Sequence, residues 1–280
     1  MSMDQTDVKT LKPDELSPAE TLAKAEGISV TKSKMGVAKC FVSAMLAGAF
    51  HRFRCHVLHG VFGRLHLPFA AQRMVGGICF CLGLVLVLCC GAELFTGNNL
   101  MVTGLASKKI SMGGMLKNWV VVWLGNLAGS LLAVALVFWA NVGGMNGGAV
   151  GDVMVSVAVS KVTPDWFMLL GKGVMCNIMV CLAVWIGFSA RTVADKVLGI
   201  LLPISFFVAA GFEHCVANMF FLPTGLLMKT MGFGASVANV GALDLGAIFY
   251  NISAATIGNI IGGAVVGLAY WFIYNQKKVK

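Results

Sequence analysis

Long apolar stretches separated by short polar segments make up most of this 280-residue chain. Six of these stretches contain few charged residues and are long enough to cross a lipid bilayer, which takes about 20 helical residues. The pattern therefore predicts an all-α membrane protein with six transmembrane helices. The predicted spans cover roughly residues 37–66, 74–106, 117–140, 166–188, 197–228 and 245–274.

The polar residues 1–36 precede the first predicted span and lack the apolar core of a cleavable signal peptide. Within them, Ser17, Pro18 and Glu20 form the pattern of a helix start, with Ser17 as N-cap and Glu20 as its capping-box partner. We therefore expect a cytoplasmic N-terminal segment with a short interfacial helix, and a cytoplasmic tail at residues 275–280.

The composition supports this class, because 58% of the residues are hydrophobic, 12% are charged and the mean hydropathy is +0.84. The net charge of +9 comes largely from Lys and Arg that lie in alternate connections between the predicted spans. Such a bias predicts that both termini are cytoplasmic. It also explains the charge without nucleic-acid binding, so we expect no nucleic-acid partner.

The motif G-x-E-x-x-x-x-N occurs twice, at residues 91–98 and 211–218. A second pair of similar segments, "GNLAG" and "GNIIG", falls in the third and sixth predicted spans. The echoes predict a duplication into residues 37–140 and 166–274, and three spans in each copy would invert the second copy in the membrane. The residues that define the motif are Gly91, Glu93, Asn98, Gly211, Glu213 and Asn218.

Both motifs lie inside long apolar stretches, where glycine, a carboxylate and asparagine are costly against lipid. We therefore expect the second and fifth spans to be broken helices that meet near the membrane midplane, where a half-helix N-terminus favours an anion. Two roles are open for Glu93 and Glu213. They would accept hydrogen bonds from loop backbone or a neighbouring helix, or they would contact the substrate directly.

His214 follows Glu213, whereas the first copy of the motif has Leu94 at the matching position. The two copies thus agree in their scaffold residues and differ in one titratable group. An intramembrane histidine, whose charge changes near neutral pH, is a candidate for pH gating or proton coupling of transport. A purely structural hydrogen-bonded histidine is the alternative.

Five ordered segments between residues 32 and 274 resemble the formate/nitrite transporter family: "GGICFCLGLVLVLCCGAELFTGN", "KNWVVVWLGNLAG", "NIMVCLAVW", "GFEHCVANMF" and "TIGNIIGG". The resemblance implies an aquaporin-like six-helix protomer and a homopentamer with one pore in each subunit. It also implies passage of formate through the lipid bilayer of the bacterial cytoplasmic (inner) membrane. Nitrite and hydrosulfide stay open as substrates, because the pore chemistry specifies only a small monovalent anion.

The resemblance also assigns roles to individual residues along the pore. For the apolar ones, ordinary helix packing is the alternative. The resemblance implies a periplasmic constriction of Phe80, Leu84 and Phe207 and a cytoplasmic constriction of Leu94 and Phe95. Thr96 and His214 would face the chamber between them, with the amide of Asn177 near His214. Asn259 would line the cytoplasmic vestibule, and Lys32 and Lys161 would place positive charge at the two mouths of the pore.

Two segments depart from the family pattern. Residues 253–255 read Ser-Ala-Ala where Ile-Pro-Val is common, which puts the local geometry of the sixth span in doubt. Lys172 stands within the fourth span at a place where an apolar residue would be usual, and it would snorkel toward outer headgroups or face a subunit interface.

Residues 51–67 carry four histidines and three arginines within the first predicted span. Three explanations compete: an out-of-frame reading of an apolar helix, a basic outer loop, or a metal site at His56 and His59. The out-of-frame reading is favoured, so no functional role is assigned to these residues.

Other classes of protein fit the sequence poorly. The nine cysteines lack CxxC spacing, so no metal site, disulfide framework or cofactor is predicted. An enzyme would need a catalytic constellation, and the spans offer one histidine without a ligand set. A non-transporting membrane scaffold remains a remote alternative, because it would not need broken spans around a buried histidine.

Overall fold

The computed structural model describes residues 15–50 and 68–275, and within these ranges every regular element is helical. The contested segment 51–67 lies outside the described residues. The α-helices are α2 (Pro18–Lys34), α3 (Val37–Phe50), α5 (Phe69–Cys90), α6 (Phe95–Asn98), α7 (Val102–Ala106), α8 (Met112–Trp139), α9 (Ala149–Val162), α10 (Trp166–Ser189), α11 (Val193–Ala209), α12 (Cys215–Thr230) and α13 (Leu245–Tyr274). Short 3-10 helices are η1 (Asn99–Met101), η2 (Val142–Gly148) and η3 (Val240–Ala242).

Five helical segments of the described part are long and apolar enough to cross a membrane: α5, α8, Val142–Val162, α10 and α13. The segment Val142–Val162, which the sequence analysis left within a connection between spans without naming a helix, contains η2 and α9. Its glycine-rich start and the charged Asp152 and Lys161 lower the hydropathy, yet its last 14 residues form the regular helix α9.

The stretches 74–106 and 197–228 do not form continuous helices. Helix α5 ends at Gly91, which adopts φ 77°, and the chain runs on to Leu94 before α6 begins. Helix α11 ends at Ala209, Gly211 adopts φ 73°, and α12 begins after His214. Both glycines occupy the left-handed region that side chains with a Cβ atom rarely adopt, which explains the first position of each motif.

Glycines allow two helix pairs to pack with their backbones in close contact. A Cβ atom on Gly129 of α8 would collide with the carbonyl oxygen of Met45 in α3. One on Gly262 of α13 would collide with the carbonyl oxygen of Val174 in α10. The glycines of "GNLAG" and "GNIIG" therefore allow close approach of neighbouring helices. Helix α13 remains continuous through residues 253–255.

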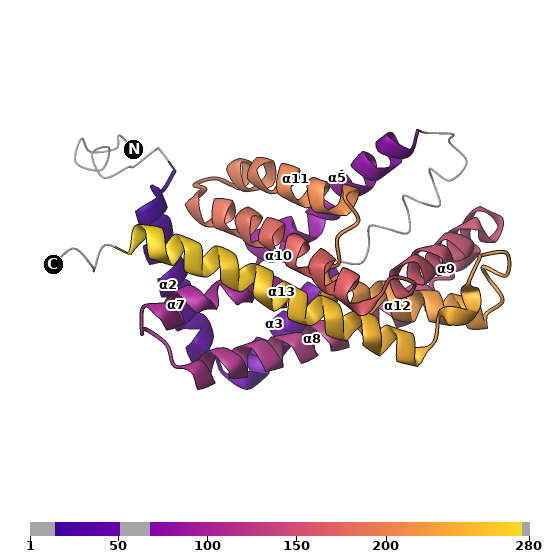
Figure 1. The fold of residues 1–280 in the computed structure, drawn as a ribbon, viewed down its shortest axis with the longest axis horizontal. Helices are drawn as coiled ribbons and strands as arrows, with labels where there is room; N and C mark the ends of the chain where they lie inside the picture. Colours follow the sequence, from indigo (N-terminus) through magenta and orange to yellow (C-terminus); the bar gives the residue numbers. More distant parts are fainter. Residues whose placement is uncertain (1–14, 51–67, 276–280) are drawn as a thin grey trace, which may run out of the picture.

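Helices α2 and α9 lie at opposite ends of the molecule, as Figure 1 shows. Helix α13 runs most of the length between them beside α10, while α5 pairs with α11 and α12 pairs with α9. Helix α2 begins as predicted, with Ser17 as N-cap and a complete capping box to Glu20. It therefore forms a defined element from its first turn.

Helix α2 is held against the rest of the chain by polar contacts. The carboxylate of Glu26 accepts hydrogen bonds from Lys109 and from Ser107, which both follow the C-terminal end of α7. Lys24 donates from Nζ to the carbonyl oxygen of Phe188 at 2.6 Å. Partial burial, with added repulsion from Lys196 and Arg191, lowers the pKa of Lys24.

Candidate functional site

The first helix break is built around the buried carboxylate of Glu93. Lys32 of α2 reaches it with Nζ at 2.8 Å from Oε1, and Asn98 donates to Oε2 at 2.7 Å. The same Lys32 also donates to Oδ1 of Asn98 at 2.7 Å. Asn118 of α8 completes the cluster, because its Oδ1 accepts from Asn98 at 2.8 Å and its Nδ2 donates to the carbonyl of Lys32. Each of these four side chains is therefore held in place by hydrogen bonds to others in the cluster.

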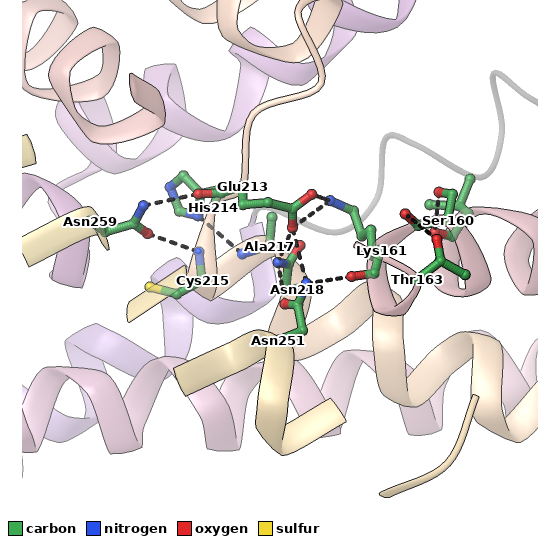
Figure 2. Close-up of polar contacts among 11 residues, drawn as sticks. Ser160, Lys161, Thr163, Glu213, His214, Cys215, Ala217, Asn218, Asn251 and Asn259 are labelled. Atoms are coloured by element: carbon green, nitrogen blue, oxygen red, sulfur yellow. Dashed lines mark hydrogen bonds and ion pairs between the residues drawn. The ribbon is translucent and has the colours of Figure 1, made fainter. Parts of the chain in front are cut away.

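The second break repeats this cluster with residues from the other half of the chain (Figure 2). Lys161 of α9 lies with Nζ 3.1 Å from both carboxylate oxygens of Glu213. Asn218 donates to Oε2 of Glu213 at 2.6 Å and to Oδ1 of Asn251 at 2.7 Å. Asn251 donates in turn to the carbonyl of Lys161 at 2.7 Å. Each break therefore has its own network of one lysine, one glutamate and two asparagines, and the two networks are built in the same way.

A further asparagine clamps the extended backbone at each break. Asn126 donates to the carbonyl of Glu93 at 2.9 Å and accepts from the N–H of Phe95 at 2.9 Å. Asn259 makes the equivalent contacts with Glu213 and Cys215, both at 2.9 Å (Figure 2). Both asparagines are fully buried. They satisfy backbone groups that the interrupted helices leave without helical partners.

His214 lies where the two halves differ and is almost completely buried. Its Nδ1 accepts a hydrogen bond from the N–H of Ala217 at 3.1 Å, so it caps α12. Its Nε2 lies 3.1 Å from Oγ1 of Thr96, and its ring stacks on Phe207 with centroids 6.0 Å apart. Because Nδ1 accepts, the neutral ring carries its proton on Nε2 and presents a donor toward Thr96.

Two open spaces lie near the helix breaks, and His214 lines one of them. The first, here called the Lys161 cavity, has a volume of about 400 Å³ and is lined by Phe80, Phe207, His214 and Lys161 among others. The second, the Lys32 pocket, is about 40 Å³ and reaches Leu84 and Leu94.

A narrow apolar space, here called the waist, separates the Lys161 cavity from the Lys32 pocket. It shares Leu84 and Leu94 with the Lys32 pocket, and it shares Phe80, Phe207 and His214 with the Lys161 cavity. The rings of Phe80 and Phe207 meet edge to face with centroids 5.4 Å apart. Lys32 and Lys161 thus line the two outer spaces, and the waist between them is lined by apolar side chains except for His214.

A sequence model described as "Formate/nitrite transporter" matches residues 19–272. The chain belongs to the formate/nitrite transporter family. The formate channel FocA of Escherichia coli (strain K12) is 38% identical over 271 residues, covering 93% of this chain and 95% of that protein. The nitrite transporter NirC of the same strain is 35% identical over 237 residues, covering 83% of this chain and 82% of NirC.

Solved structures of the formate/nitrite transporter family also match the fold. A pentameric formate channel with formate bound has a TM-score of 0.75 and 35% identity, covering 86% of this chain and 98% of that chain. An FNT family ion channel has a TM-score of 0.78 and 30% identity, covering 91% of this chain and 98% of the other.

The structure places the remaining expected site residues as follows. Asn177 is fully buried and donates to the carbonyls of Thr96, at 3.2 Å, and Asn259, at 2.6 Å, so it supports the residue beside His214. Phe95 is buried against Trp119, with ring centroids 6.3 Å apart. Asn259 lies at the second break, where its amide bonds to the backbone of Gly173 and Glu213, and its expected role in the cytoplasmic vestibule stays a prediction.

Three site residues escaped the sequence analysis. Asn118 and Asn251 complete the two networks, and Arg73 lies in the wall of the Lys161 cavity. A signal for the first two exists, because "NWVVVWLGN" and "NISAATIGN" each place an asparagine eight residues before Asn126 or Asn259. Two steps of four residues keep both side chains on one helix face.

Proposed function

We propose that this chain passes formate and similar small monovalent anions across the bacterial cytoplasmic membrane, as a homopentamer with a pore in each subunit. Support comes from family membership and from the named relatives, among them a pentameric formate channel with formate bound. The observation that carries the proposal is the position of His214 in the apolar waist between two lysine-bearing spaces.

The proposed topology has six spans, of which the second and fifth are broken in the membrane, arranged as an inverted repeat. The matching networks around Glu93 and Glu213 support it, because equivalent helices supply equivalent residues. The placement of α2 and α9 at opposite ends supports the inversion (Figure 1). The positive connections favour cytoplasmic termini, which puts Lys32 on the cytoplasmic side and Lys161 on the periplasmic side.

In the proposed mechanism, an anion leaves water at either lysine and crosses the waist without its full hydration shell. Phe80, Leu84 and Phe207 narrow the waist on the periplasmic side, and Leu94, with Phe95 next to it in the chain, narrows it on the cytoplasmic side. Stripping water from an anion is costly unless a donor replaces it. The Nε2–H group of neutral His214 supplies that donor, and Thr96 holds it in place when the waist is empty of substrate.

A permanent positive charge in the waist would trap the anion, whereas a neutral donor lets it leave. Lys32 and Lys161 avoid such a trap, since each is paired with a carboxylate outside the waist. The two ion pairs therefore stabilise the helix breaks and attract the anion only weakly.

The decisive experiment is flux through proteoliposomes containing the purified full chain. Formate, nitrite and hydrosulfide are supplied in turn at equal concentration, and a His214→Asn variant serves as control. Formate flux in the parent that exceeds protein-free vesicles supports the proposal. Passage of nitrite or hydrosulfide in preference to formate would reassign the substrate, and absence of flux for all three would refute transport.

A further inference from the structure

Lys172 lies in the wall of the Lys161 cavity, on helix α10. It stands three residues after Leu169 and four residues before Cys176, both fully buried, and residues at these spacings share a helix face. Met168 and Met175, at the complementary spacings, are exposed, so Lys172 lies at the edge of the buried face of α10, where it reaches the cavity wall. Its carbonyl oxygen accepts a hydrogen bond from the N–H of Glu213 at 3.3 Å, so it flanks the second break directly.

The described residues that line the Lys161 cavity carry three cationic side chains and one carboxylate. Lys161 is compensated by Glu213, since both carboxylate oxygens lie 3.1 Å from its Nζ. Arg73 donates from Nε to the carbonyl of Ala209 at 3.0 Å, which is a neutral acceptor. Among these lining residues, the charges of Arg73 and Lys172 have no carboxylate to offset them.

We infer that Lys172, together with Arg73, forms an anion subsite in the Lys161 cavity. The ligand is the transported monovalent carboxylate or a similarly small anion, so the inference rests on the proposed function. Excess positive charge in a cleft raises the local concentration of anions and speeds their entry. Phe207 and His214 line the same cavity, so an anion held at the subsite is in the space from which the waist is entered.

The size of the effect follows from the distance over which the charge acts. One unit charge at about 10 Å in water changes the local concentration of a monovalent anion about twofold, and a partly shielded cavity strengthens this. Salt screens it, because the Debye length falls from about 30 Å at 0.01 M to about 3 Å at 1 M ionic strength. Weak, screened binding suits a conduction path, because an anion must also leave.

The test compares the parent with Lys172→Met, which keeps the length of the side chain and removes its charge. Formate flux into proteoliposomes is measured over a range of formate concentrations at about 0.01 M and about 1 M ionic strength. We expect Lys172→Met to raise the half-saturating formate concentration about two- to fivefold at low ionic strength and to match the parent at high ionic strength. Lys172→Arg should behave as the parent at both.

Lys117→Met is the matched control, since it removes an exposed lysine at the start of α8. Equal half-saturating concentrations for the parent and Lys172→Met at low ionic strength would overturn the subsite. A parent without formate flux would instead refute the proposed function. In that case saturation-transfer NMR of formate on the solubilised pentamer decides, because the signal should weaken in Lys172→Met and an unchanged signal would overturn the subsite.

Discussion

The Nδ1 atom of His214 accepts a hydrogen bond from the backbone N–H of Ala217 at 3.1 Å, so a single imidazole both caps α12 and faces the waist. The cap occupies one ring nitrogen and leaves Nε2–H as the group that reaches Thr96. The scaffold thus selects the tautomer that offers a donor to an anion.

Two substitutions separate the cap from the donor. In His214→Asn, the shorter amide can still cap the helix but does not reach the waist, whereas His214→Phe removes both functions. We expect formate flux to fall at least about tenfold in both variants, as loss of a donor worth about 1.4 kcal/mol would give. Thermal unfolding should show His214→Phe to be the less stable by about 1 kcal/mol. Parent-like flux in His214→Asn would reduce the histidine to a structural cap.

The same geometry predicts how flux depends on pH. A second proton on the ring must go to Nδ1, where it removes the acceptor for Ala217 and places a positive charge at the N-terminal end of α12. The charged ring would also hold an anion too strongly. We therefore expect parent flux to fall on acidification between about pH 8 and pH 5, and the flux of His214→Asn to change little. A parallel decline in both proteins would place the titrating group elsewhere.

We expect the loss of one partner of the Lys161–Glu213 ion pair to destabilise the fold more than the loss of both. The side chains are 16% and 5% exposed, so either one left alone is a largely buried, unpaired charge. Lys161→Met should lower the free energy of unfolding by up to about 3–5 kcal/mol, and Lys161→Met combined with Glu213→Gln should lower it by less. Thermal unfolding of the pentamer in detergent measures both. Additive losses would show that the two side chains are not coupled.

Much of the helical arrangement could be predicted from the sequence, because apolar length, glycine and the doubled motif act locally. Gly91 and Gly211 mark the ends of α5 and α11 through a backbone conformation that hydropathy does not report. Helix α9 was missed because hydropathy is low in a segment that is nevertheless helical. Its polar residues lower the average hydropathy although Lys161 is needed inside the structure as the partner of Glu213.

The networks around the breaks were harder to predict, since their members come from separate helices. Asn118 pairs with Asn98, and Asn251 pairs with Asn218, across large gaps in the sequence. One amide in an apolar helix gives no sign of its partner. Two roles were open for Glu93 and Glu213: accepting hydrogen bonds within the protein, or contacting the substrate directly. In the structure, each carboxylate accepts hydrogen bonds from a lysine and from asparagine side chains.

Phe207 and Phe206 provide a neighbouring pair that tests the waist. Phe207 is buried against Phe80 and His214, whereas Phe206 is 53% exposed. Phe207→Ala should widen the waist, raise formate flux and admit larger monovalent anions such as acetate. Phe206→Ala should leave the anion selectivity of the parent unchanged. Selectivity that stays the same in Phe207→Ala would move the constriction to other residues.

The last prediction concerns the glycines that bring α10 and α13 together, because these helices carry Asn177 and Asn259. A Cβ atom on Gly262 would meet the backbone of Val174, whereas one on Gly171 would meet nothing within 4 Å. Gly171→Ala should therefore be neutral or stabilising by up to about 1 kcal/mol, since alanine is the better helix former. Gly262→Ala must push the helices apart.

That separation should be felt at the second break. Asn259 of α13 bonds to the carbonyl of Gly173 in α10 at 2.8 Å, and Asn177 of α10 bonds to the carbonyl of Asn259 at 2.6 Å. Both bonds would lengthen in Gly262→Ala, which loosens the clamp on Glu213 and Cys215. We expect a loss of about 1–3 kcal/mol in thermal unfolding together with reduced formate flux. A Gly262→Ala protein as stable and as active as Gly171→Ala would show that backbone contact between these helices does not hold the break in place.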